Sequence, residues 1–144
     1  MTFGEPALRC RVDLQTTTDS LFERLGGRPQ LMRLLRHFYA DVRQHQEIGP
    51  IFAAQISDWP AHLEKIGNFW SNVTGGPMRY DGPMPQRHFP LGLEPRHFEA
   101  WLDLWRRNCR IYLAPGEADE MIAAAEAIGE RLRWLIGRNQ AAGA

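Results

Sequence analysis

The sequence predicts an all-α fold, and two observations support this prediction. Apolar residues recur at the three- and four-residue spacing of a helix along most of the chain, and no segment shows sustained alternation of apolar and polar residues. Prolines and small polar residues stand where these segments begin, as they do in the first turn of helices. The pattern predicts about five helices and one long loop, and no internal repeat is visible.

The N-terminal part of the chain predicts a tail and two helices. Residues 1–17 show no clear periodicity, which is typical of a loose terminus. Ser20 and Glu23 fit a capping box for the short helix LFERL, which the following glycine pair ends. Pro29 suits the first turn of the next helix. The apolar face of that helix comprises Leu31, Leu34, Leu35, Phe38, Tyr39 and Val42.

The middle of the chain predicts a turn, a helix and a loop. The turn is GPIF, residues 49–52. Ser57 or Asp58 can cap the helix, Pro60 fits its first turn, and its inward residues are expected to be Leu63, Ile66, Trp70 and Val73. Residues 74–93 are rich in glycine and proline and predict a loop, with room for about one helical turn around residues 86–89.

Two longer helices are predicted at the C-terminal end. Pro95 begins the first of them, whose inward face comprises Phe98, Trp101, Leu102, Trp105, Cys109 and Tyr112. Pro115 and Gly116 separate it from the last helix, expected near Glu117–Ile136. The inward face of that last helix comprises Met121, Ile122, Ala125, Ile128, Leu132 and Leu135.

Composition limits the class of protein. A chain of 144 residues with 44% apolar residues predicts one folded domain. Lys plus Arg equals Asp plus Glu at 17 each, so net charge gives no reason to expect nucleic acid or an anionic membrane as partner. No apolar run approaches the roughly 20 residues that span a bilayer, and the N-terminus lacks the apolar core of a signal peptide. Cys10 and Cys109 stand far apart, which favours reduced thiols and a cytoplasmic location.

Several common site motifs are absent from the sequence. It contains no GxxxxGK[ST], no GxGxxG after a strand and no CxxC, so phosphate loops, dinucleotide folds and structural zinc have no support. The stretch HLE at residues 62–64 matches HxE of the zinc deaminases, but their PCxxC is missing. Neither HExxH nor GxSxG occurs.

Two histidines stand in different settings. His62 begins HLEKIGNFW and shares a helical face with Lys65, Ile66 and Phe69, whereas His88 lies in the proline-bounded segment MPQRHFPL. Such a face suits haem, a flat apolar group with a charged rim, whose iron is commonly bound by neutral imidazole. It equally suits an ordinary helix with an outward charge beside an inward apolar stripe. From the residues alone both interpretations stay open.

Other candidate residues have ordinary explanations when they are taken singly. His37, His45 and His97 are expected at the surface or in loops. Tyr39 and Trp101 fit the periodicity of core aromatics, and Phe52 fits a buried residue of a turn.

The order of five motifs resembles a known family. LFERLGGRPQLMRLLRHFYADV, GPIF, HLEKIGNFW, RHF at residues 87–89 and FEAWLDLW follow one another as in the truncated haemoglobins, and most closely as in their third group. The resemblance covers residues 19–137. It implies a two-over-two helical sandwich around haem b, with a shortened first helix and a proximal helix reduced to about a turn.

The resemblance also implies a role for individual residues. His88 matches the proximal iron ligand, and Phe52 matches the aromatic that packs on the haem face. Tyr39, His62 and Trp101 match the distal residues, a combination typical of the third group. Further expected residues are Phe38, Ile66 and Phe69 in the distal pocket, Trp70 behind it, Lys65 and Arg87 at the propionates, and Arg79 and Tyr80 as additional haem contacts.

The sequence differs from the family pattern in two places. We expect an extension at residues 1–18, a globin domain at 19–138 and a tail at 139–144, and this extension is longer than the family requires. A glycine pair at residues 75 and 76 is followed by a proline-rich loop, where the alignment is loose.

The resemblance implies binding of O₂, CO or NO at a penta-coordinate ferrous iron. Tyr39 and Trp101 are then candidate hydrogen-bond donors to the ligand, and His62 is expected to donate, to act as a gate or to bind the iron. The function follows as ligand binding with detoxification of NO or reactive oxygen. The alternatives are an NO dioxygenase or peroxidase-like enzyme that depends on a separate reductase, and a gas sensor. A haem-free helical scaffold, with structural histidines, is the hypothesis from another class.

Overall fold

The structure is a computed structural model that describes residues 19–77 and 92–143, with side chains up to residue 138. These residues form helices and no strand, which confirms the predicted all-α fold. The helices are α2 (Leu21–Leu25), α3 (Gly27–Gln44), α4 (Gly49–Gln55), α5 (Trp59–Val73), α7 (Pro95–Tyr112) and α8 (Pro115–Gly143).

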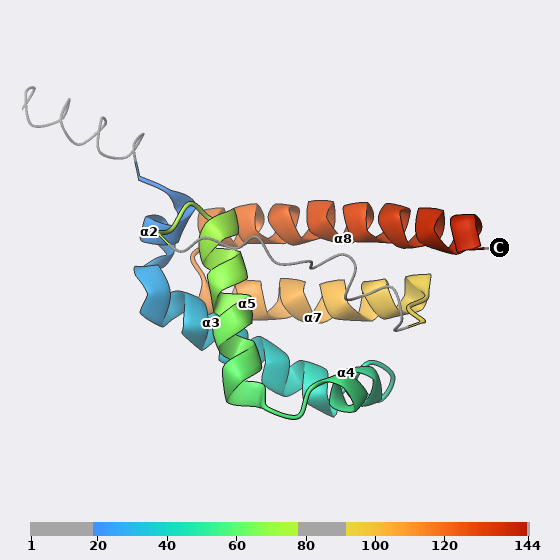
Figure 1. Cartoon of the computed structure of the whole chain (residues 1–144). Helices are drawn as coiled ribbons and strands as arrows, with labels where there is room; N and C mark the ends of the chain where they lie inside the picture. Colours follow the sequence, from blue (N-terminus) through green and yellow to red (C-terminus); the bar gives the residue numbers. More distant parts are fainter. Residues whose placement is uncertain (1–18, 78–91, 144) are drawn as a thin grey trace, which may run out of the picture.

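The four longest helices form two packed pairs. Helices α7 and α8 lie side by side and run in opposite directions, as Figure 1 shows. Helix α5 packs on α3 and crosses in front of that pair, and α3 also contacts α7. The short helices α2 and α4 stand at the two ends of α3 (Figure 1). The core therefore lies where α3, α5, α7 and α8 meet.

The junction of α2 and α3 has the predicted N-cap at Ser20 and the predicted glycine pair. Ser20 is the N-cap of α2, and its hydroxyl accepts a hydrogen bond from the Glu23 backbone N–H at 3.2 Å. Gly26 ends α2 with a φ of 108°, and Gly27 begins α3 with a φ of 78°. Both angles lie in the left-handed region that glycine adopts without steric cost. The glycine pair thus allows α3 to start immediately after α2.

The predicted inward face of α3 is confirmed. Leu31, Leu34, Leu35, Phe38 and Val42 are fully buried, and Tyr39 is 5% exposed. This apolar stripe follows the helical period, so one side of α3 supplies the centre of the core.

The GPIF segment is a helix, and its prediction as a turn was wrong. Residues 49–55 form α4, with Pro50 in the first turn. A helix of seven residues completes about two turns, which are too few to show a periodic apolar face. Proline at the start and Ala53, Ala54 and Gln55 afterwards are the local features that favour it.

Helix α5 begins as predicted, and three of its four expected inward residues lie at the core, since Trp70 is buried and Leu63 and Ile66 are partly buried against it. Asp58 is its N-cap, and Oδ1 accepts a hydrogen bond from the Ala61 N–H at 3.1 Å. The buried residues are Gly67, Trp70 and Ser71, whereas Val73, expected inward, is 38% exposed. Small residues at the contact let α5 approach α3 closely: a Cβ at Gly67 would lie 2.5 Å from the Met32 sulfur. This close approach fixes the rotation of α5 and directs Val73 outward.

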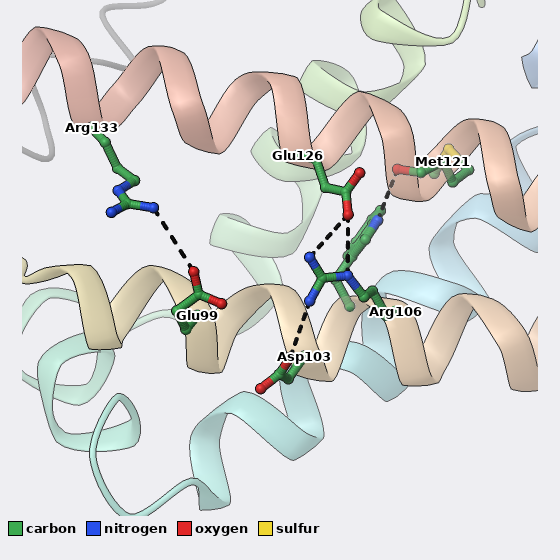
Figure 2. Close-up of polar contacts among 7 residues, drawn as sticks. Glu99, Asp103, Arg106, Met121, Glu126 and Arg133 are labelled. Carbon is green, nitrogen blue, oxygen red and sulfur yellow. Dashed lines mark hydrogen bonds and ion pairs between the residues drawn. The ribbon is translucent and has the colours of Figure 1, made fainter.

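Helices α7 and α8 are joined by polar and apolar contacts. The Arg106 guanidinium contacts Glu126 at 2.9 Å across the two helices and Asp103 at 3.0 Å within α7 (Figure 2). The buried Trp105 indole N–H donates to the Met121 carbonyl at 3.0 Å. Beyond this, a second apolar cluster comprises Leu93, Phe98, Ile128, Leu132 and Ile136.

Two further predictions change at the C-terminal end. Helix α8 runs from Pro115 to Gly143 and is longer than the predicted Glu117–Ile136, although the predicted inward residues are buried or partly buried. His97, expected at the surface, is 8% exposed, and its Nδ1 accepts a hydrogen bond from the Glu94 backbone N–H at 2.9 Å as part of the α7 cap.

The predicted turn at residues 86–89 lies outside the described residues. Among the helices of the described residues, none has the length and apolar character needed to cross a bilayer.

Candidate functional site

Three side chains from three helices meet at one end of the core. Tyr39 comes from α3, His62 from α5 and Trp101 from α7. The Tyr39 and His62 ring centroids are 6.2 Å apart with perpendicular planes. The Trp101 indole N–H donates a hydrogen bond to the Tyr39 hydroxyl oxygen. The structure therefore brings together the three residues expected on the distal side.

The Tyr39 hydroxyl is held in its neutral form. Burial raises the pKa of Tyr39 above its ordinary value, and the hydrogen bond from Trp101 opposes this rise only in part. The oxygen accepts a hydrogen bond from the Trp101 N–H, while the phenol keeps its own proton and can donate a second hydrogen bond with it. This arrangement suits Tyr39 as a donor to a small electron-rich ligand.

Aromatic rings surround the Tyr39 side chain. Phe38 lies edge-on to Tyr39 at 4.8 Å and to Trp101 at 5.3 Å. The partly buried Phe52 of α4 lies 6.0 Å from Tyr39. Helix α4, which the sequence did not predict, thus positions Phe52 beside Tyr39. The hydroxyl consequently sits in apolar surroundings, where a hydrogen bond is stronger than in water.

An incompletely covered apolar face follows His62 along α5. Ile66 and Phe69 stand four and seven residues after His62, on the same side of the helix, and both are only partly buried. Trp70 lies behind them and stacks on Trp105 at 4.5 Å. Lys65 on this helix is exposed.

Four predicted residues lie outside the described residues. They are the expected proximal ligand His88, the expected propionate partner Arg87, and the additional haem contacts Arg79 and Tyr80. Their roles remain predictions.

The sequence interpretation missed Trp59 at the start of α5. Its ring is 5.6 Å from His62 and 5.9 Å from Tyr39. The Arg43 guanidinium lies over the same indole, 4.6 Å from the ring centroid. A signal was present in the sequence, because Trp59 precedes His62 by three residues and so shares its helical face.

Comparisons with known proteins place this arrangement in a family. Residues 20–123 match the family described as bacterial-like globins, and this match covers most of the chain. The chain belongs to the bacterial-like globin family. Within it, the globin is similar to the group 3 truncated hemoglobin ctb of Campylobacter jejuni subsp. jejuni, with 35% identity over 111 residues. That alignment covers 74% of this chain and 87% of the relative, and confirms the resemblance to the third group.

Solved structures show the same fold. The group III truncated hemoglobin of Campylobacter jejuni superposes with a TM-score of 0.71 at 30% identity, covering 76% of this globin and 91% of that chain. The 2/2 hemoglobin of Synechococcus sp., in a cyanomet state with covalently attached heme, superposes with a TM-score of 0.72 at 22% identity. That match covers 82% of this globin and 98% of the other chain. The two-over-two fold is thereby confirmed.

The residues at the site fit the haem that the globin family implies. Ile66 and Phe69 offer a partly buried apolar face suited to a flat apolar ring. The polar groups of the site are one phenol, one imidazole and one indole. Over the described ranges, 19–77 and 92–143, no cluster of three metal-binding side chains occurs that would suit a bare ion instead.

Proposed function

We propose that this globin binds haem b and uses it to hold O₂, CO or NO, with His88 as the iron ligand. Bound haem would supply a ferrous iron with one open coordination position. Phe52, Ile66 and Phe69 would contact the ring, with Phe38 and Trp70 behind them. Lys65, Arg87, Arg79 and Tyr80 are the proposed polar contacts at its edge.

One observation carries the proposal: a buried neutral phenol that accepts a hydrogen bond from an indole and stands beside an imidazole. Because the indole can only donate, the Tyr39 oxygen is the acceptor toward Trp101, and the hydroxyl proton is left to donate to another group. A ligand such as O₂, which gains negative charge on binding, accepts a hydrogen bond from that hydroxyl better than CO does. A hydrogen bond to a charged acceptor contributes about 1.5–3 kcal/mol, so we infer selective retention of O₂.

Absorption spectroscopy of the purified globin tests this function. We expect a Soret band, and distinct shifts when O₂ or CO is added to the reduced protein. His88→Gly should lose the haem or hold it only with added imidazole. His37→Gly, which removes an exposed histidine stacked on Tyr112, is the matched control. Full haem content and an unchanged ferrous spectrum in His88→Gly would refute His88 as the ligand.

We further propose that the globin acts on NO or reactive oxygen and does not transport O₂. The three polar groups of the site, Tyr39, His62 and Trp101, favour slow O₂ release, and tightly held O₂ is better placed to react than to be delivered. Conversion of O₂ and NO to nitrate takes one electron from the protein. Turnover therefore requires a separate reductase, and we propose one as a partner in the cytoplasm.

Rapid mixing of the oxygenated reduced globin with NO tests this role. We expect one nitrate per haem and ferric protein, formed at about 10⁷ M⁻¹s⁻¹ or faster. A slow reaction, or ferric protein that no cellular reductant restores, would argue instead for ligand binding or gas sensing.

A further inference from the structure

We propose that Trp59, held by Arg43, is a positioning residue that keeps the His62 imidazole turned toward Tyr39. This inference rests on the proposed ligand site and extends it to a residue pair that does not itself hold the ligand. In this proposal, the first residue of α5 determines the orientation of the His62 ring.

Two perpendicular ring contacts define the place of His62. Its ring is 5.6 Å from Trp59 at an interplanar angle of 85°, and 6.2 Å from Tyr39 at 89°. Edge-to-face contacts at these separations are favourable because the positive edge of one ring meets the negative face of the other. Tyr39 and Trp59 are also 5.9 Å from each other. The imidazole therefore packs against two aromatic rings that contact one another.

Trp59 is itself restrained from two sides. Arg43 and Tyr39 stand one helical turn apart on α3, and both contact the Trp59 ring. The backbone at Trp59 is fixed by the Asp58 N-cap and by Pro60 in the same turn. The Arg43 guanidinium, 4.6 Å from the ring centroid, adds a cation–π contact. The indole is consequently a rigid support for the His62 ring.

The solvent exposure of the side chains decreases from Arg43 to Tyr39. Arg43 is exposed, Trp59 and His62 are partly buried, and Tyr39 is 5% exposed. Removing the Trp59 indole would expose the His62 imidazole to water, which solvates it well. His62 would then spend more time turned away from Tyr39. Trp59 thus sets the distal environment without contacting the ligand.

Substitution of Trp59 in two backgrounds tests the inference. Trp59→Leu is made in the native globin and in His62→Leu, and Trp59→Phe serves as the conservative variant. Trp134→Leu is the matched control, because Trp134 is an exposed tryptophan with Arg131 and Arg138 over its ring at 5.7 and 5.0 Å. The measurements are proton NMR contacts between the His62 and Tyr39 rings, and rates of CO and O₂ binding.

We expect Trp59→Leu to abolish the His62–Tyr39 NMR contacts and to change the rate of ligand association by about fivefold or more. In the His62→Leu background, the same substitution should change the rate little. Trp59→Phe should restore the contacts in part, and Trp134→Leu should change neither measurement. Intact contacts in Trp59→Leu would overturn the inference. So would a rate change of equal size in the His62→Leu background, because Trp59 would then act independently of His62.

The NMR measurement separates this inference from the proposed function. If the native globin bound no haem, the proposed function would fail. The ring contacts of His62 would still be measured in the haem-free chain and would still decide the role of Trp59. If Trp59→Leu did not fold, the comparison of Trp59→Phe with the native globin would decide it.

Discussion

The hydrogen bond from Trp101 leaves the Tyr39 hydroxyl as a donor toward a ligand. Trp101 can only donate through its indole N–H, so the Tyr39 oxygen must be the acceptor in that pair. The phenol keeps its proton because burial raises its pKa. Two residues from different helices therefore act together, and removal of either one changes what the other presents to a ligand.

Tyr39→Phe and Trp101→Phe should both speed O₂ release. Tyr39→Phe removes the proposed direct donor, which is worth about 1.5–3 kcal/mol or roughly a ten- to hundredfold change in rate. CO release should change less, since CO gains little negative charge. Flash photolysis and stopped-flow kinetics measure both rates. Substitutions that left O₂ release within about a factor of two would exclude these residues as donors.

Cys109 should make folding stability depend on alkaline pH. Burial raises the pKa of this thiol from an ordinary value near 9 to about 12. The folded state thus keeps the proton that the unfolded chain loses, so the contribution is complete below pH 9 and is lost as pH rises toward 12. Denaturant unfolding at several pH values measures it.

Cys109→Ala provides the control for that experiment. The variant should lose the decrease that begins near pH 9 and keep a later one from Tyr39, whose pKa is also raised by burial. An identical pH profile in the variant would contradict the assignment to Cys109.

At the scale of the element, close packing at glycines decides how helices meet. Gly49 stands at the first residue of α4, where a Cβ would lie 2.7 Å from the Arg43 carbonyl oxygen at the end of α3. Backbone atoms cannot move aside as side chains can, so α4 is held where only glycine fits. This contact places Phe52 next to Tyr39.

Gly49→Ala should destabilise the globin, because the added methyl group would push α4 away from α3. We expect a loss of about 1–3 kcal/mol in the free energy of unfolding. Gly129→Ala is the matched control in α8, where the new Cβ would meet Leu102 at an ordinary 3.9 Å. It should stabilise by about 1 kcal/mol through helix propensity. Equal effects at the two sites would refute the packing argument.

At the scale of the whole molecule, Trp105 joins the helix layers. The side chain is fully buried on α7, stacks on Trp70 of α5 at 4.5 Å and on Trp101 at 5.6 Å. Its indole N–H donates to the Met121 carbonyl of α8. One residue of α7 thereby contacts both α5 and α8 and stacks on Trp101 of the candidate site.

Trp105→Ala should lower the free energy of unfolding by about 3–5 kcal/mol, as expected for removal of a buried aromatic. Arg106→Ala, at the next residue of α7, should cost no more than about 1 kcal/mol, because its ion pairs with Asp103 and Glu126 lie at the surface (Figure 2). Chemical denaturation measures both. A loss in Arg106→Ala as large as that in Trp105→Ala would show that the surface network holds α7 to α8.

The sequence by itself determined the features that depend on neighbouring residues. The apolar face of α3, the cap Ser20 and the places of Pro29, Pro60 and Pro95 in first helical turns were correctly predicted, and Asp58 was one of the two candidate caps of α5. Each of these depends on a periodicity or on a hydrogen bond within a few residues, so one segment contains the whole signal. The order of motifs indicated the family. This resemblance led to the expectation that Tyr39, His62 and Trp101 stand on one side of a haem.

Only the tertiary structure decided how each helix is rotated and which rings touch. Periodicity favoured Val73 as an inward residue, but packing on α3 through Gly67 turned it outward. The contacts of Trp59 with His62 and Arg43 join two helices that the sequence treats separately. The physical reason is that spacing fixes faces within one helix, whereas shape complementarity between helices fixes the angle at which these faces meet.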